Sequence, residues 1–161
     1  MKLFEDLHIG ERFMLGQHSF SAEEIKTFAR RFIPQPFHVD EDAAARSHFG
    51  QLCASGWHTA AIWMRLMVEH HRREDEKRRA RGEPVAEFGG SPGFRELKWL
   101  KPVHVGDTVS YATEVIALRA SKSRPEWGLM TMRNSGSNQR GEPVISFVST
   151  AFIQRRAGAA S

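Results

Sequence analysis

The sequence predicts an α+β fold in which an antiparallel β-sheet wraps around one long central helix. Residues 55–71 (SGWHTAAIWMRLMVEHH) place apolar side chains on nearly every side of a helix for several turns, a pattern typical of a helix enclosed by other structure. After residue 93, segments of alternating apolar and polar side chains indicate strands of an antiparallel sheet. A sheet around a single helix satisfies both patterns and needs no parallel crossover.

The first part of the chain predicts a strand, two short helices and a loop. Residues 11–20 alternate in the manner of a strand, and Ser21 with Glu24 three residues later forms the capping-box pattern that begins a helix. Residues 33–38 (IPQPFH) are expected to form an ordered loop, because two prolines remove amide donors and favour extended predecessors. Asp40 is the expected N-cap of a second short helix. The buried stripe of the first helix is expected to consist of Ile25, Phe28 and Ala29.

The central helix is expected to begin at Ser55, which is its candidate N-cap. From His70 it continues as a charged run that ends near Gly82 and Pro84, so residues 70–90 form a helical extension away from the core. Residues 94–100, 108–120, 127–133 and 144–153 follow as strands. Turn-forming residues separate them, above all in the segment NSGSNQRGEP.

The bulk properties predict one domain over residues 1–154, followed by a disordered tail at 155–161. The chain has 161 residues, of which 40% are apolar, as is usual for a single globular domain. It contains no apolar run near the roughly 20 residues that cross a bilayer. The first residues lack the basic start, apolar centre and cleavage site of a signal peptide. We therefore expect a soluble, cytoplasmic protein without a membrane partner.

The cysteine and charge content exclude two further classes. The only cysteine, Cys53, cannot form an intramolecular disulfide, and its small or apolar neighbours favour a buried structural thiol over a nucleophile. The net charge of +4 comes largely from residues 70–82, where acidic residues interrupt the basic ones and aromatic residues for base stacking are absent. We therefore expect no nucleic-acid partner.

Three blocks carry a family resemblance: FARRFIPQPFHVDEDAAA at 28–45, FGQLCASGWHTAAI at 49–62 and ELKWLKPVHVGDTV at 96–109. Together they resemble the MaoC-like dehydratases and the (R)-specific enoyl-CoA hydratases, and the likeness covers the chain from Phe4 to the last strand. The resemblance implies a single hotdog domain. It also implies a hydro-lyase of fatty acid metabolism that hydrates trans-2-enoyl-CoA or dehydrates 3-hydroxyacyl-CoA, with coenzyme A present only as part of the substrate. A homodimer or a larger homo-oligomer is implied as well.

The resemblance also implies the positions of the site. In this family, a loop presents an Asp and, five positions later, a His, and both reach one water molecule; the His corresponds to His38. The amide of a glycine at the start of the central helix binds the thioester oxygen, and Gly56 matches that glycine. A base must take a proton from water as it attacks the β-carbon, while a donor stabilises the enolate oxygen. The expected substrate contacts are Gln35, Pro36, Phe37, Ser55 and Trp57.

The Asp position of the family motif is Ile33, which can neither orient a water molecule nor accept its proton. Loss of a general acid or base costs about 10² to 10⁴ in rate. Three hypotheses follow: His38 works alone or with a substitute carboxylate such as Asp40, the site binds acyl-CoA without turnover, or a paralogous partner subunit supplies the active residues. Asp40 is favoured as a helix cap rather than as that carboxylate.

Other candidates have structural interpretations. His58 is favoured as a core histidine, and the cluster of Trp57, Trp63 and Met64 as core that shares in an acyl tunnel. Three basic residues are interpreted equally as coenzyme A contacts or as solvated charges: Arg95, Lys98 and Lys101. Thioesterase activity ranks third, because the central helix offers no carboxylate before Glu69. The adjacent histidines at 70 and 71 lack metal-ligand spacing, so no metal site is expected.

Overall fold

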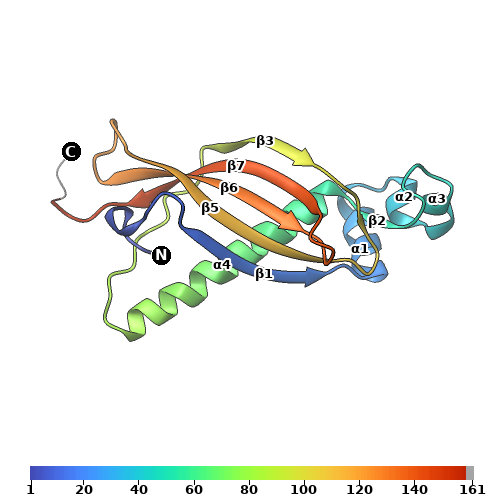
Figure 1. Ribbon diagram of the computed structural model, residues 1–161, viewed down its shortest axis with the longest axis horizontal. Coiled ribbons are helices and arrows are strands. Elements are labelled where there is room, and N and C mark those ends of the chain that lie inside the picture. The colour runs from blue at the N-terminus through green and yellow to red at the C-terminus, as the bar shows by residue number, and fades with distance from the viewer. Residues whose placement is uncertain (159–161) are drawn as a thin grey trace.

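The computed structural model describes residues 1–158 and confirms the predicted architecture, a five-stranded antiparallel sheet with one long helix along its face (Figure 1). The helix, α4, spans Gly56–Ala80. Neither α4 nor any other helix in residues 1–158 has the apolar length that a membrane crossing requires. The strands in their spatial order are β1 (Arg12–Ser19), β5 (Thr108–Ala120), β6 (Trp127–Ser137), β7 (Pro143–Gln154) and β3 (Gly93–Trp99).

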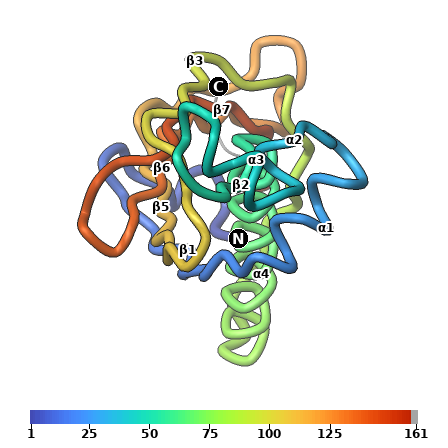
Figure 2. Tube along the Cα trace, turned by 90° about the vertical axis from the view of Figure 1, so that its right-hand side faces the viewer, coloured from blue at the N-terminus to red at the C-terminus, as the bar shows by residue number. Residues whose placement is uncertain are grey.

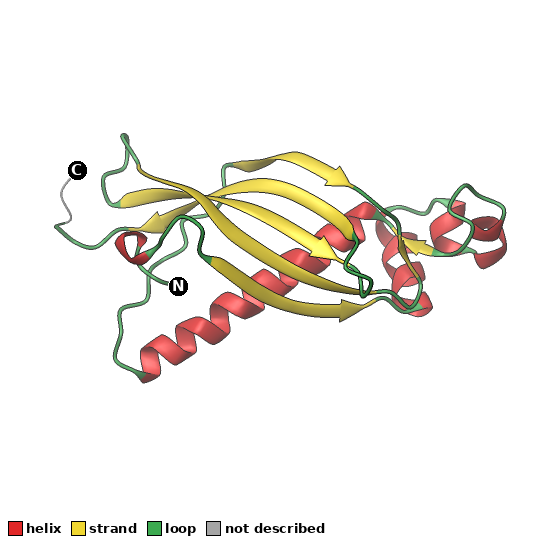
Figure 3. Cartoon of the chain, viewed as in Figure 1, coloured by secondary structure: helices red, strands yellow, loops and turns green. Residues whose placement is uncertain are grey.

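Short elements gather at one end of the sheet, beside the start of α4 (Figure 3). They are α1 (Ala22–Phe32), α2 (Pro36–Val39), α3 (Glu41–Ala45) and the two-residue strands β2 (Cys53–Ala54) and β4 (Val103–His104), which pair with each other. At the opposite end of the sheet, η1 (Phe4–Asp6) is a single 3-10 turn.

The prediction that residues 33–38 form a loop without helix was wrong in its second half. Pro36 is the first residue of α2, and His38 lies within that helix. The first turn of a helix leaves its amides without intrahelical partners, so a proline there loses no hydrogen bond and its fixed φ suits the helix. His38 therefore sits on a helical turn rather than on an extended loop.

The three predicted helix caps are confirmed. Ser21 Oγ accepts a hydrogen bond from the amide of Glu24 at 3.2 Å, and Asp40 Oδ1 accepts one from the amide of Ala43 at 2.7 Å. Ser55 Oγ likewise accepts from the third amide of α4 at 3.2 Å. The capping box at Ser21 is only half formed, because the Glu24 carboxylate binds His18 at 2.9 Å instead of returning to the Ser21 amide.

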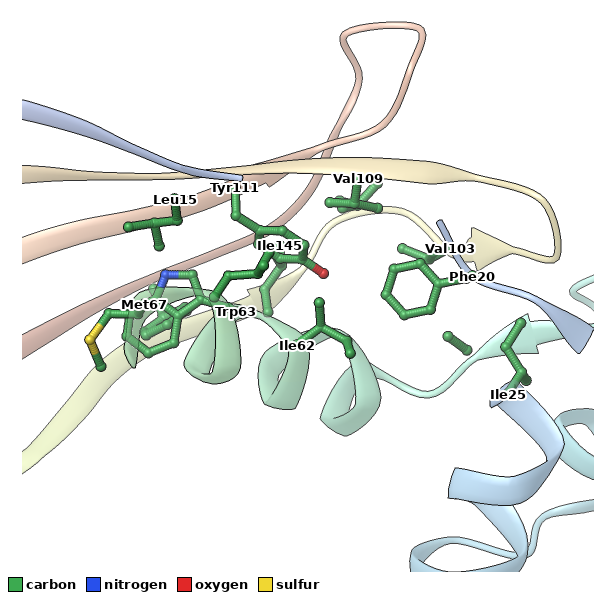
Figure 4. Packing of buried hydrophobic residues seen from close by; sticks show 14 of the residues in the cluster. Leu15, Phe20, Ile25, Ile62, Trp63, Met67, Val103, Val109, Tyr111 and Ile145 are labelled. Carbon is green, nitrogen blue, oxygen red and sulfur yellow. The ribbon is translucent and has the colours of Figure 1, made fainter. Parts of the chain in front are cut away.

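The main core lies between the first half of α4 and the inner face of the sheet. Figure 4 shows Ile62 and Trp63 of α4 beneath Tyr111 and Ile145 of the strands. Tyr111 also donates its hydroxyl hydrogen to the carbonyl of Thr59 at 3.1 Å. The sheet is thus anchored to the helix both by packing and by a buried hydrogen bond.

The expectation that α4 is enclosed on all sides was wrong for this chain. Trp57, Met64 and Val68 are 50%, 50% and 56% exposed, and their spacing places them on one face of the helix. A single sheet covers only one side of a helix, so the opposite apolar side stays open. Figure 2 shows the last turns of α4 projecting beyond the rest of the chain.

Strand β6 continues to Ser137, past the expected end at residue 133. The fully buried Asn134 makes this possible, because it accepts a hydrogen bond from Thr113 Oγ1 and donates one to Ser149 Oγ at 2.9 Å. With its polar groups satisfied, an asparagine fits the inner face of a sheet despite its preference for turns.

The expected tail at 155–161 begins with residues that the structure places. Arg155 and Arg156 form ion pairs with Glu5 and Asp6, each at 2.9 Å. Residues 159–161 lie outside the described part of the chain.

Candidate active site

A cavity of about 330 Å³ opens where α2, β2 and the start of α4 meet. Its wall includes most of the residues that the sequence assigned to the site: Ile33, Gln35, Phe37, His38, Ser55, Gly56 and Trp57. Pro36 and Asp40 do not line it. The remaining wall comes from the segment 99–103 and from five further residues: Phe49, Cys53, Ala54, Thr59 and Val144. The cavity therefore brings together residues from all three sequence blocks, at 28–45, 49–62 and 96–109.

The surroundings of His38 keep its imidazole neutral and able to act as a base. It is only 6% exposed, and its Nδ1 lies 2.8 Å from the carbonyl oxygen of Cys53. A carbonyl can only accept, so Nδ1 carries the hydrogen and Nε2 is left with its lone pair. Among residues 1–158, no protein group binds Nε2. Burial lowers the pKa of His38, so the imidazole is neutral at neutral pH and able to accept a proton.

The start of α4 supplies hydrogen-bond donors. Ser55 binds the third amide of the helix through its side chain, whereas the amides of Gly56 and Trp57 have no intrahelical partner. Within the described residues, neither amide donates to another protein group. Both residues line the cavity, and the helix dipole adds partial positive charge at this end. These amides can receive a carbonyl oxygen that develops negative charge.

A neighbouring side chain leaves no room for a Cβ atom at position 56. A Cβ atom at this position would lie 2.2 Å from Cε2 of Trp99, because the indole of Trp99 rests directly on the helix start. Trp99 in turn meets Trp57 edge to face at 5.3 Å. No local pattern predicts this contact, since it joins β3 to α4 across more than forty residues.

The cavity wall contains no carboxylate among the residues that the structure describes. Ile33 lines the cavity at the position where the family motif has Asp. The Asp40 carboxylate does not replace that Asp, because it caps α3. Lys101 lines the cavity and pairs with Glu142. Cys53 Sγ lies 3.8 Å from His38 Nδ1, and burial raises the pKa of this thiol to about 11. The thiol is thus protonated at neutral pH, as a structural cysteine would be.

A polar network that was not predicted surrounds His58, which does not line this cavity. His58 is buried and stacks on Phe28 at 4.3 Å, with its Nε2 3.5 Å from Glu24 Oε1. The other Glu24 oxygen binds His18, whose Nδ1 accepts from Arg65 at 3.0 Å. Burial lowers the pKa of His58. The network ties α1, β1 and α4 together, and no local sequence pattern links these positions.

No group of His, Cys, Asp and Glu side chains within residues 1–158 is arranged to hold a metal ion.

Comparisons with known proteins agree with this architecture. The family model described as the MaoC-like domain matches residues 8–132. The solved structure of a MaoC-like dehydratase from Rhodospirillum rubrum is 39% identical, with a TM-score of 0.79, and the match covers 97% of this chain and 99% of that one. A Mycobacterium tuberculosis protein described as a double hotdog fold has a TM-score of 0.76 at 18% identity, over 99% of this chain and 46% of that one. At that identity the likeness concerns the fold alone.

Two curated relatives extend the comparison. The Bacillus subtilis protein YdeM, described as uncharacterized, is 29% identical over 155 residues, which are 96% of this chain and all of that protein. Mesaconyl-CoA hydratase from Cereibacter sphaeroides is 38% identical over 68 residues, or 42% of this chain. The matched segment spans only 20% of that enzyme.

Proposed function

Because the chain belongs to the MaoC-like domain family, we propose that it binds an enoyl-CoA or 3-hydroxyacyl-CoA thioester beside His38 and slowly interconverts the two. One observation carries this proposal: the free Nε2 of a neutral His38 and the free amides at the start of α4 share one cavity. A base and an oxyanion donor are the two groups that addition of water to an enoyl thioester requires.

In the proposed reaction, the thioester carbonyl accepts a hydrogen bond from the Gly56 amide. Nε2 of His38 takes a proton from a water molecule while its oxygen attacks the β-carbon. Negative charge moves to the thioester oxygen, where the amide and the helix dipole stabilise it. The imidazolium then returns the proton to the α-carbon. One imidazole thus performs both proton transfers, and the reverse sequence removes water.

The rate is expected to be low, because Ile33 stands where the family places its carboxylate. Loss of one general acid or base costs about 10² to 10⁴ in rate, which corresponds to about 3–5 kcal/mol of transition-state stabilisation. The cavity offers no replacement, since the Asp40 carboxylate is bound to an amide of α3.

A second candidate function is acyl-thioester binding without turnover, alone or beside a paralogous subunit that supplies the acid chemistry. The absence of Asp and Glu from the described cavity wall favours it. The same absence gives no support to thioester hydrolysis, which on this fold also needs a carboxylate.

The proposed assembly is a homodimer in the cytoplasm. The open face of α4, formed by Trp57, Met64 and Val68, adjoins the edge strand β3 with its exposed Phe94, and a second copy would cover both. Light scattering should report a dimer that Met64→Glu with Val68→Glu converts to monomer. Ile9→Glu, which replaces another exposed apolar residue, should leave the dimer intact.

The deciding experiment measures crotonyl-CoA hydration by the absorbance of the conjugated thioester. We expect slow native turnover, a gain of at least about tenfold in Ile33→Asp, and none in Ile33→Asn, which is similar in size but cannot ionise. His38→Ala should abolish turnover, whereas His8→Ala, at an exposed histidine outside the cavity, should not.

Calorimetric titration with crotonyl-CoA separates binding from chemistry. Binding with no turnover in either the native protein or Ile33→Asp would select the silent binding module. Fast native turnover that survives His38→Ala would overturn the roles proposed here.

A further inference from the structure

A second cavity, of about 350 Å³, lies beside the second half of α4, facing β1, β5 and β6. It shares no lining residue with the His38 cavity. Gly56 and His71, which line the two cavities, are separated by about 22 Å along the helix axis at 1.5 Å per residue. Its volume is at the lower end of the roughly 300–1,000 Å³ of small-molecule sites. It is therefore large enough for a single small chain.

Methionines dominate the apolar part of this cavity. The chain has six methionines, and four of them line it: Met1, Met14, Met130 and Met132. Met130 and Met132 are buried in the sheet and form the floor, whereas Met14 is exposed at the mouth. Unbranched, polarizable thioether side chains adapt to flexible apolar ligands better than branched ones do. The floor suits an alkyl chain.

One positively charged side chain on the cavity lining has no ion-pair partner among residues 1–158. Four cationic side chains, the Met1 ammonium and one carboxylate line the cavity, and most of them are already paired: Met1 with Asp75, Lys2 with Glu11, Arg78 and Arg81 with Glu83, and Glu74 with Lys77. Arg12 is exposed on β1, where its backbone pairs with Glu114 of β5, and its guanidinium forms no ion pair or hydrogen bond with residues 1–158. An anionic group could therefore approach Arg12 without displacing a partner.

The two histidines on the helix wall add no charge at neutral pH. His70 and His71 both line the cavity, and burial, the largest cause, lowers the pKa of His71 to about 4. Burial lowers the pKa of His70 as well. The cavity thus combines an apolar floor, neutral imidazoles and a single unpaired cation at its mouth.

We propose that this cavity binds a medium-chain fatty acid, with its alkyl chain on Met130 and Met132 and its carboxylate at Arg12. The site is independent of the chemistry at His38. Such a ligand is the free acid of the acyl groups that the other cavity is proposed to hold, and this link alone rests on the proposed function.

The test is a decanoate titration of the full chain labelled with ¹³C-methyl methionine. Signals of Met14, Met130 and Met132 should shift with a common dissociation constant. Met64, on the open face of α4, and Met67, in the main core, serve as internal controls and should not move. Shifts confined to Met64 and Met67, or no saturable shift at all, would overturn the proposal.

Charge variants test the role of Arg12. Arg12→Glu should weaken decanoate binding by roughly fivefold to tenfold, because an attraction is replaced by a repulsion at an exposed site. Arg119→Glu, at another exposed arginine on a strand and away from the cavity, should leave the affinity unchanged. Crotonyl-CoA should not displace decanoate. Equal effects of the two variants, or displacement by crotonyl-CoA, would refute the site.

Discussion

Replacing Gly56 with alanine tests how closely the helix start and Trp99 are fitted together. The new Cβ would lie 2.2 Å from Trp99 Cε2, where ordinary contact begins at 3.4 Å, so the indole must retreat by about 1.2 Å. Trp99 cannot retreat freely, because its backbone is paired with Ile145 of β7 and its ring meets Trp57 edge to face.

The expected cost follows from two opposing effects. Overpacking of this kind costs about 1–3 kcal/mol, and the helix preference of alanine over glycine returns at most about 1 kcal/mol. We expect a net loss of about 1–2 kcal/mol in the free energy of unfolding. For a chain of this size, that loss corresponds to a fall in Tm of about 2–8 °C.

A double-mutant cycle isolates the contact. Urea unfolding, followed by circular dichroism at one protein concentration, is measured for Gly56→Ala alone and combined with Trp99→Ala or Trp57→Ala. The cost of Gly56→Ala should vanish when Trp99 is truncated and persist when Trp57 is truncated. An equal cost in both backgrounds would show that the indole of Trp99 is not what excludes a side chain at position 56.

Three further outcomes are expected. Hydration activity should fall as pH falls, with a midpoint below the ordinary histidine value of 6.5, because only neutral His38 can accept a proton and burial lowers its pKa; a midpoint above 6.5 would contradict that assignment. Burial lowers the pKa of His71 from 6.5 in the unfolded chain to about 4 in the folded chain, so the unfolded chain takes up the proton first as pH falls. The free energy of unfolding is therefore highest above pH 6.5 and decreases as pH falls toward 4. At 1.36 kcal/mol per unit this is at most about 3 kcal/mol, and urea unfolding of His71→Gln should show a flatter dependence over that range. Asn134→Leu should lower the free energy of unfolding by about 2–4 kcal/mol, since it leaves Thr113 and Ser149 without their buried partner; an unchanged urea midpoint would show that the network is dispensable.

The parts of the fold that depend on local pattern could be predicted from the sequence. Ser21, Asp40 and Ser55 begin helices as expected, because a cap is a contact between residues three apart. The strands were predicted from alternating apolar and polar side chains, which is also a pattern among residues close together in the sequence. Asn134 was misjudged as a turn residue, since its partners on β5 and β7 are not visible in its own segment. The open side of α4 was misjudged because periodicity shows that a face is apolar, not what covers it.

The candidate site divides in the same way. The motif around His38 and the glycine before the central helix predicted two groups that the structure brings to one cavity. The contact between Gly56 and Trp99 and the network from His18 to His58 were not predicted. Each joins segments far apart in the chain, and only the folded sheet makes them neighbours.

The bond from His38 to the carbonyl of Cys53 has a consequence for engineering. A main-chain oxygen aims the imidazole, so its orientation tolerates substitution at position 53 and does not rely on an acid at position 33. A designer who wishes to add acid chemistry to this scaffold therefore starts with the histidine already aligned, and has one side chain to install rather than a constellation to rebuild.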